Sequence, residues 1–105
     1  MSLEKARNRY IPMSETMFYI LLSLREARHG YAIMQHVEEL TRGRIRLGAG
    51  TVYSSLGKLE GDGLIEPVSE EDRRKIYKIT SVGSAILWEE AGRIAELYKN
   101  SGGLL

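Results

Sequence analysis

The segment 48–65 constrains the fold more than any other part of the chain, because a helical pattern there ends directly before a strand. Its apolar residues recur at steps of three and four, which places them on one face of a helix. They are Ala49, Val52, Tyr53, Leu56 and Leu59. The opposite face is short, rich in hydroxyl groups and ends in a cation; it consists of Thr51, Ser54, Ser55 and Lys58. Gly61-Asp62-Gly63 ends the helix and Leu64-Ile65 begins a strand. A helix followed at once by a hairpin predicts a winged helix-turn-helix.

The residues before this segment predict the helices that such a domain needs. We expect a first helix from Ser14, a good N-cap residue, to about Ala27. It is almost entirely apolar, so we expect it to be central. A second helix is expected from Tyr31 to about Thr41. Alternating polar and apolar residues at 44–47 predict a short strand before the third helix.

The residues after it predict the wing and a last helix. Strands are expected at 64–68 and 75–79, joined by a six-residue charged loop at 69–74. Pro67 indicates an edge strand, because proline cannot donate a ladder hydrogen bond. Thr80 or Ser81 can cap a helix that continues to about Asn100. The predicted fold is mainly helical with a small hairpin. Residues 1–80 form a winged helix-turn-helix domain with an N-terminal arm, and residues 81–105 form a dimerisation helix and tail.

Composition excludes several classes of protein. A chain of 105 residues with 43% hydrophobic residues is expected to fold as one domain. The absence of cysteine excludes disulfides and thiolate metal sites. No apolar run is long enough for a membrane span or a signal peptide, so we expect a cytoplasmic protein. No nucleophile and base pair indicates an enzyme, and no motif indicates a cofactor.

The two histidines do not predict a metal site. His29 lies in an expected turn and His36 in an expected helix, and no third ligand is spaced to join them. We expect His29 to stabilise the turn by bonding to the backbone.

The charge of the chain is nearly balanced but unevenly distributed. The formal net charge is +1, which by itself does not indicate a nucleic-acid binder. Cations nevertheless gather in groups at residues 5–9, 42–46 and 73–75, whereas acidic residues gather in the last helix. Local basic patches of this kind can attract DNA while another side of the molecule stays acidic.

The order and spacing of several short motifs across about residues 14–83 resemble the PadR-like transcriptional regulators. The motifs are His29-Gly30-Tyr31, Gly50-Thr51-Val52-Tyr53, Leu59-Glu60, Asp62-Gly63-Leu64-Ile65, Arg74, Tyr77, Ile79-Thr80 and Gly83. The resemblance implies a dimeric bacterial repressor that binds operator DNA through the third helix and the wing. It also implies a response to small molecules such as phenolic acids or drugs. The single helix after Thr80 resembles the smaller branch of that family.

The candidate DNA contacts lie on the third helix and the wing. Thr51, Ser54, Ser55 and Lys58 can enter the major groove, where hydroxyls and lysine bond to bases or phosphates. Tyr53 is expected to face the core partly and to offer its hydroxyl to a phosphate. Arg73, Arg74 and Lys75 are the candidate wing contacts, although the acidic residues at 70–72 oppose them. A winged helix that serves only protein contacts is the alternative.

The last helix carries the candidate dimer interface. Leu87, Ala91, Ile94 and Tyr98 recur at steps of four, three and four, and Trp88 and Ala95 widen this stripe. We expect an obligate homodimer, with the first residues of the chain wrapping around the partner. The alternative is that the helix folds back on its own domain. A pocket formed by Trp88 and its symmetry mate is the candidate site for a small aromatic effector.

Overall fold

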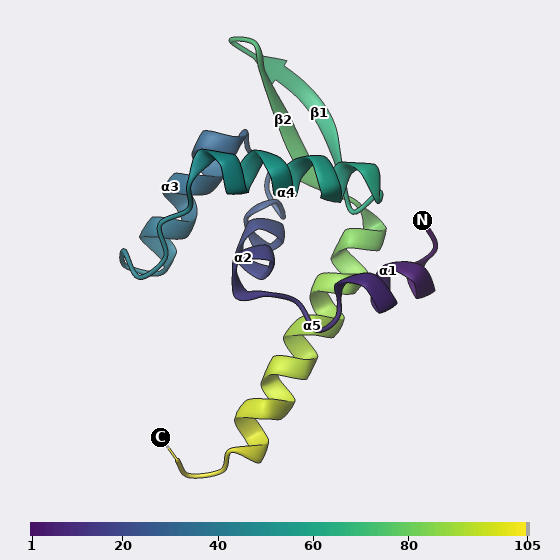
Figure 1. Ribbon diagram of the computed structural model, residues 1–105, viewed down its shortest axis with the longest axis vertical. Coiled ribbons are helices and arrows are strands. Elements are labelled where there is room, and N and C mark those ends of the chain that lie inside the picture. Colours follow the sequence, from purple (N-terminus) through teal and green to yellow (C-terminus); the bar gives the residue numbers. More distant parts are fainter. Residues whose placement is uncertain (105) are drawn as a thin grey trace.

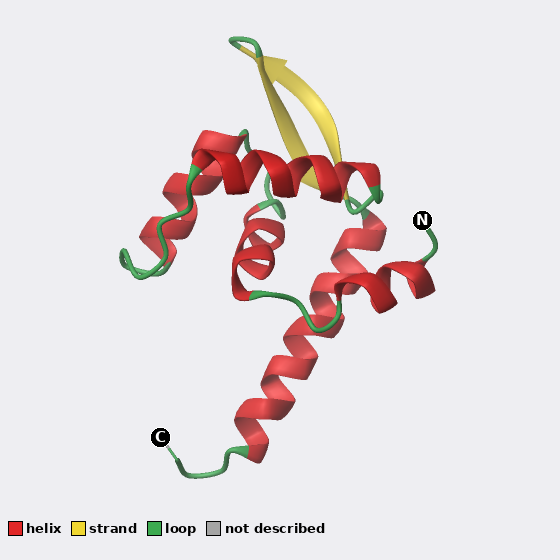
Figure 2. Ribbon diagram, in the orientation of Figure 1, coloured by secondary structure: helices red, strands yellow, loops and turns green. Residues whose placement is uncertain are grey.

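The computed structural model describes residues 1–104, which fold into helices and one hairpin (Figure 1). In chain order the elements are α1 (Leu3–Tyr10), α2 (Glu15–Ser23), α3 (Gly30–Leu40), α4 (Ala49–Gly61), β1 (Ile65–Glu71), β2 (Arg74–Ile79) and α5 (Ser81–Asn100). Helices dominate, and the antiparallel hairpin projects from one side of the helical body (Figure 2). The mainly helical winged fold predicted from the sequence is confirmed.

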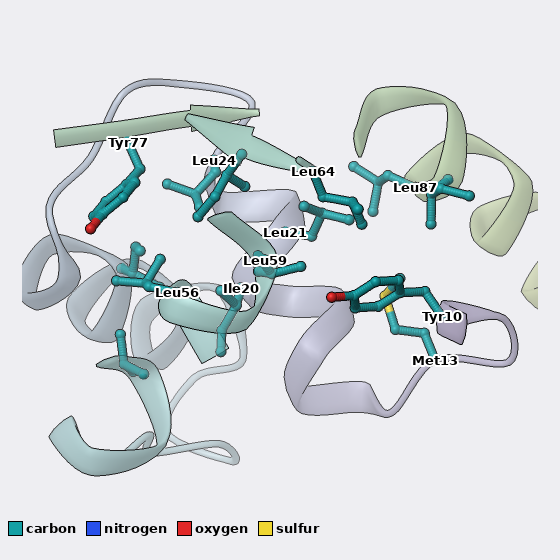
Figure 3. Packing of buried hydrophobic residues seen from close by; sticks show 14 of the residues in the cluster. Tyr10, Met13, Ile20, Leu21, Leu24, Leu56, Leu59, Leu64, Tyr77 and Leu87 are labelled. Atoms are coloured by element: carbon teal, nitrogen blue, oxygen red, sulfur yellow. The ribbon is translucent and has the colours of Figure 1, made fainter. Parts of the chain in front are cut away.

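The hydrophobic core lies where α2 meets α3, α4 and α5 (Figure 3). Ile20, Leu21 and Leu24 of the α2 segment are fully buried, so the expectation of a central helix is confirmed. Side chains from the other elements close around them: Ile33, Val37, Val52, Leu56, Leu59, Leu64, Ile65 and Ile86. Those of them that lie on helices have the spacing that the sequence pattern predicted for inward faces.

The helix starts agree with the predicted caps. Ser14 accepts a hydrogen bond from the backbone of Met17, and Thr80 accepts one from Gly83. His29 caps α3, because its Nδ1 accepts the N–H of Ala32 at 3.1 Å. The expectation that His29 stabilises this turn through the backbone is therefore confirmed.

α2 is shorter than predicted, since it ends at Ser23 rather than near Ala27. The residues that follow pair with the wing instead of continuing the helix. Ile79 donates to the carbonyl of Leu24 at 2.8 Å, and Arg28 exchanges hydrogen bonds with Tyr77 at 2.9 and 3.0 Å. These bonds attach the base of the wing to the helical body.

The strand predicted at 44–47 is wrong, because the segment forms an irregular turn without a strand partner. Arg42 and Gly43 have φ values of 53° and 80°, in the left-handed region. The Thr41 hydroxyl accepts the N–H of Ile45 at 3.0 Å and donates to the carbonyl of Val37 at 2.8 Å. This side chain satisfies the Ile45 N–H, which a neighbouring strand would otherwise satisfy.

The wing is longer than predicted and its loop is shorter. The expected six-residue loop is wrong, because residues 69–71 pair with residues 74–76. Only Asp72 and Arg73 form the turn, with φ values of 48° and 64°. A turn with two positive φ values matches the right-handed twist of the flanking strands. The ladder shifts register between Pro67 and Ser69. Arg28 forms its hydrogen bonds with Tyr77 of β2, and not with β1, the strand that contains Pro67.

The sequence predicts an N-terminal arm here, whereas the structure has a helix, α1. Ser2 caps the helix and Glu4 lies in its first turn, and these two residues were the available signal. Ala6 and Tyr10 are buried at 0% and 4% exposure, and α1 packs against α5 of its own chain. In this structure the first residues therefore complete the chain's own core.

α5 belongs to the core at its start and leaves the body at its end (Figure 1). Gly83, Ile86, Leu87 and Glu90 are buried, whereas most side chains after Ala91 are exposed. Gly83 has no room for a side chain, since a Cβ there would lie 2.1 Å from the Leu64 carbonyl oxygen. A search of the described helices finds none that is long and apolar enough to cross a membrane.

Candidate nucleic-acid interface

The outward face of α4 is nearly flat. Gly50, Ser54, Gly57 and Gly61 recur at steps of four, three and four, opposite the buried residues of the helix. A Cβ added to any of these glycines would meet nothing within 4 Å. The backbone of α4 can therefore approach an external surface closely on this side.

The predicted contact residues of α4 lie along this face and its edges. Thr51, Ser54 and Lys58 are exposed, and Ser55 is half-buried on the flank. The N-cap of α4 is Gly48, which makes no side-chain hydrogen bond to the first turn. The first N–H groups of α4 are therefore available to an acceptor outside the chain.

Tyr53 lies between α3 and the wing. A Cβ at position 30 would lie 2.9 Å from the Tyr53 ring, so Gly30 is required for this ring to lie against α3. The side chain remains 55% exposed, and Tyr53 is not part of the buried core. It lines an open recess of about 340 Å³ together with His29, Gly30, Glu70, Arg73, Arg74, Lys75 and Tyr77. The recess brings α4 and the wing cations onto one surface.

The three wing cations occupy different positions. Arg73 lies in the turn itself, whereas Arg74 and Lys75 belong to β2. The Arg74 guanidinium carbon lies 5.9 Å from the centre of the Tyr31 ring, which in turn stacks on His29. Glu71 and Glu70 face Arg74 and Lys75 across the ladder, but within residues 1–104 none of these acids forms an ion pair within 4.0 Å of them. Arg74 therefore links the wing to α3, and Arg73 is the cation at the tip.

The basic group at 42–46 is largely neutralised within the chain. Arg44 pairs with Glu15, and this guanidinium lowers the pKa of the Glu15 carboxyl. Arg46 pairs with Glu38 at 3.0 Å. This group therefore contributes less positive charge to the surface than the sequence suggests.

The candidate dimer residues divide into two sets. Leu87 is only 6% exposed and belongs to the chain's own core. Trp88, Ile94 and Tyr98 are 79%, 40% and 66% exposed, and Ala91 and Ala95 are exposed between them. Leu97, which the sequence analysis did not single out, is 55% exposed. Its position three residues after Ile94 was the available signal.

Two shallow apolar recesses adjoin this exposed stripe between α2 and α5. One has a volume of about 440 Å³ and the other of about 300 Å³. Phe18 and Ala91 contribute to both, Ile94 to the larger and Trp88 to the smaller. The exposed stripe therefore borders both recesses.

A buried carboxylate, Glu90, pairs with the half-buried Arg93 beside the larger recess. Glu90 is 0% exposed, accepts the N–H of Met13 at 2.7 Å and pairs with Arg93 at 2.6 and 2.9 Å. The hydrogen bonds from Arg93, and secondarily the one from Met13, hold the pKa of the Glu90 carboxyl below its ordinary value despite burial. Glu90 therefore ties the segment before α2 to α5.

In the part of the chain that the structure describes, no three His, Cys, Asp or Glu side chains gather where they could hold a metal ion. His29 is used as a helix cap, and His36 Nδ1 lies 3.4 Å from the guanidinium of Arg28.

Comparison with known proteins identifies similar chains. Residues 19–89 match the Transcriptional regulator PadR-like family. Transcriptional regulator YqjI of Escherichia coli is 32% identical over 88 residues, which cover 83% of this chain and 42% of that protein. Transcriptional regulator Rv3488 of Mycobacterium tuberculosis is 36% identical over 65 residues, covering 59% of this chain and 61% of that protein. The chain thus spans only part of the length of these relatives.

Among solved structures, a PadR family transcriptional regulator from Eggerthella lenta superposes with a TM-score of 0.71 at 26% identity. The match covers 95% of this chain and 85% of that chain.

Proposed function

Since the chain belongs to the PadR-like family of transcriptional regulators, we propose that it binds operator DNA as a homodimer and represses transcription. Members of this class regulate transcription and are not enzymes. The observation that carries the proposal is the shared surface of α4 and the wing. The flat polar face of α4, Tyr53 and the wing cations all border one side of the molecule, where they can meet a duplex together.

In this proposal α4 enters the major groove with its glycine-containing face toward the base edges. The exposed hydroxyls of Thr51 and Ser54 can donate to or accept from bases, and Ser55 and Lys58 contact the edge of the groove. The absence of side chains at Gly50, Gly57 and Gly61 shortens the distance between the α4 backbone and the DNA.

The recess between α4 and the wing accepts the sugar-phosphate backbone. The Tyr53 hydroxyl and the cations Arg73 and Lys75 border it, and Arg74 supports the wing from α3. Contacts of this kind set the position of a protein on DNA and do not depend on sequence.

Dimerisation uses the exposed stripe of α5 and its adjoining recesses. A second copy of this helix would cover Trp88, Ile94 and Tyr98, which are otherwise exposed apolar surface. Two recognition helices about 34 Å apart would then contact a palindromic operator. A small aromatic effector bound near Trp88 and its symmetry mate would release the DNA by changing that separation.

An electrophoretic mobility shift with the promoter region of the chain's own gene tests this function. We expect retarded complexes at low and moderate salt, with a duplex of random sequence bound more weakly. Ser54→Ala should cost about 1 to 3 kcal/mol of binding free energy on the operator and much less on the random duplex. No binding to either duplex would instead favour a winged helix that serves protein contacts.

A further inference from the structure

The C-terminal end of α4 is held by side chains from α1. Asp62 is the C-cap residue of α4, and both of its carboxylate oxygens are engaged. The Tyr10 hydroxyl donates to Oδ2 at 2.6 Å, and the Arg9 guanidinium donates to Oδ1 at 2.9 Å. Both oxygens are thus bonded to side chains of α1, and neither forms an ion pair within 4.0 Å with the cationic neighbour on α4.

That neighbour is Lys58, four residues earlier on the helix. Its Nζ lies 5.4 Å from the centre of the Tyr10 ring. Lys58 forms no ion pair within 4.0 Å with any acidic side chain in residues 1–104. Side chains four residues apart on a helix are close enough to pair, and the charge of Lys58 contributes to the lowered pKa of Asp62.

α1 packs firmly against the rest of the chain, so the hydrogen bonds from Tyr10 and Arg9 to Asp62 are part of the fold. Tyr10 is 4% exposed and lies beside Met13 at the edge of the core (Figure 3). Arg7 makes two hydrogen bonds of 2.8 Å to Glu89 of α5. The strongest influence on the pKa of Asp62 is the hydrogen bond from Tyr10, which keeps the carboxyl charged.

Without the bonds from Tyr10 and Arg9, the Asp62 carboxylate would be free to pair with Lys58. A lysine that pairs with a carboxylate instead of a phosphate does not add to the number of neutralised phosphates, which sets the salt slope. In the proposed complex, a released carboxylate would also repel DNA phosphates near this end of α4. Holding Asp62 therefore preserves a cation at the edge of the proposed DNA surface.

We propose that Tyr10 and Arg9 are positioning residues for DNA binding, which restrain the Asp62 carboxylate and so leave the Lys58 ammonium free for the DNA backbone. This inference rests on the proposed function, because it concerns how α4 meets the duplex. It extends the functional surface to α1, although Tyr10 itself is buried and touches no DNA.

The test uses Tyr10→Phe, which removes the hydroxyl and keeps the ring and the net charge. Binding to a fluorescent duplex of random sequence is measured by anisotropy over a range of salt concentrations, because a phosphate contact does not require the operator. The slope of log affinity against log salt should become shallower by at most about 0.9, the value for one phosphate contact, because Arg9 still donates to Oδ1 of Asp62. Affinity at 0.1 M salt should fall by up to about eightfold, because a slope difference of about 0.9 over the tenfold range from about 1 M salt corresponds to that factor. Lys58→Ala should reproduce both changes.

Asp62→Asn supplies the control, because an asparagine cannot neutralise Lys58. In this background Tyr10→Phe should change neither the slope nor the affinity. An equal loss in both backgrounds would mean that Tyr10 only stabilises the fold, and would overturn the inference. Unchanged binding by Tyr10→Phe in the wild-type background would overturn it as well.

Arg9→Gln provides a second variant at an exposed position if Tyr10→Phe does not fold, as judged by circular dichroism. It should weaken binding more in the wild-type background than in Asp62→Asn, and equal losses would overturn the inference. A wild-type chain that binds no duplex would overturn the proposed function, and this inference with it.

Discussion

At the residue scale, the glycines of α4 have no structural explanation within the chain. Gly50, Gly57 and Gly61 have helical backbones and open space where a side chain would stand. A glycine inside a helix costs about 1 kcal/mol of stability relative to alanine. In the proposed function this loss of stability is offset by closer approach to DNA.

Gly57→Ala should therefore separate stability from function. We expect the free energy of unfolding to rise by about 0.5 to 1 kcal/mol, because alanine restricts the unfolded chain and favours the helix. Affinity for DNA should fall, because the added methyl group keeps α4 away from the groove. Chemical denaturation and anisotropy measure the two effects. The matched control is Gly92→Ala in α5, where a Cβ also meets nothing within 4 Å; it should stabilise the chain without weakening DNA binding.

The lowered pKa of Glu90 makes the free energy of unfolding depend on pH. The pKa of its carboxyl is lowered in the folded chain, first by the hydrogen bonds from Arg93. A group with a lowered folded pKa stabilises the fold above its unfolded pKa and loses this effect as the pH falls through the folded pKa. The contribution of Glu90 is therefore complete at neutral pH and declines once the pH falls below about 4.3.

Glu90→Gln should be less stable than the wild type at pH 7, and the difference should shrink as the solution is acidified. Urea denaturation at neutral and acid pH measures the change. The exposed Glu96→Gln is the control and should follow the wild type at both pH values. If the loss of unfolding free energy in Glu90→Gln stays constant with pH, this would argue against a charged Glu90 in the folded chain.

At the scale of elements, the wing is a hairpin whose cations have different surroundings. Arg73 is presented by the turn, and Arg74 is held over Tyr31 at the start of α3. The hydrogen bonds between Arg28 and Tyr77 attach the hairpin to the body. The wing can therefore hold its cations in a defined place while its tip remains exposed.

Replacing Arg73 and Arg74 together by alanine should weaken binding to every DNA sequence. The salt slope should fall by about 0.9 for each phosphate that the variant no longer neutralises. Anisotropy at several salt concentrations gives the slope directly. Lys99→Ala removes one positive charge from the last turn of α5, far from the wing, and should leave the slope nearly unchanged. An unchanged salt slope in the wing variant would mean that these arginines contact solvent and not DNA phosphates.

At the scale of the whole molecule, the exposed half of α5 points to assembly. The extents of the chain are 49 × 35 × 20 Å, and the far end of α5 projects along the longest axis (Figure 1). Trp88, Ile94, Leu97 and Tyr98 are 79%, 40%, 55% and 66% exposed, and exposed apolar side chains gathered on one element mark interaction sites. The proposed homodimer would bury this surface and place two α4 helices on one duplex.

Ile94→Glu should convert the dimer to a monomer, because burying an unpaired carboxylate in an apolar interface is strongly unfavourable. Sedimentation velocity measures the change. Asn100→Glu introduces the same side chain on a different face of α5 and should remain dimeric. A monomeric wild type, or an Ile94→Glu variant that remains fully dimeric, would contradict the proposed stripe.

The sequence by itself determined the features that depend on neighbouring residues. Helix starts at Ser14 and Thr80 were predictable because a capping side chain bonds to the backbone only a few residues ahead. The buried face of α4 was predictable because apolar residues three and four positions apart lie together on any helix. The family followed from short motifs, and the structure gives two of them a physical meaning, since Gly30 makes room for the ring of Tyr53.

Only the tertiary structure decided the features that join distant parts of the chain. The segment 44–47 has a strand-like alternation, but a strand also needs a partner, and Thr41 supplies its hydrogen bonds instead. Leu87 and Ile94 share one pattern on α5, yet the body covers the first and leaves the second exposed. The Tyr10 hydroxyl meets Asp62 across 52 residues of sequence. Periodicity reports which face of an element is apolar, whereas the position of every other element decides what that face meets.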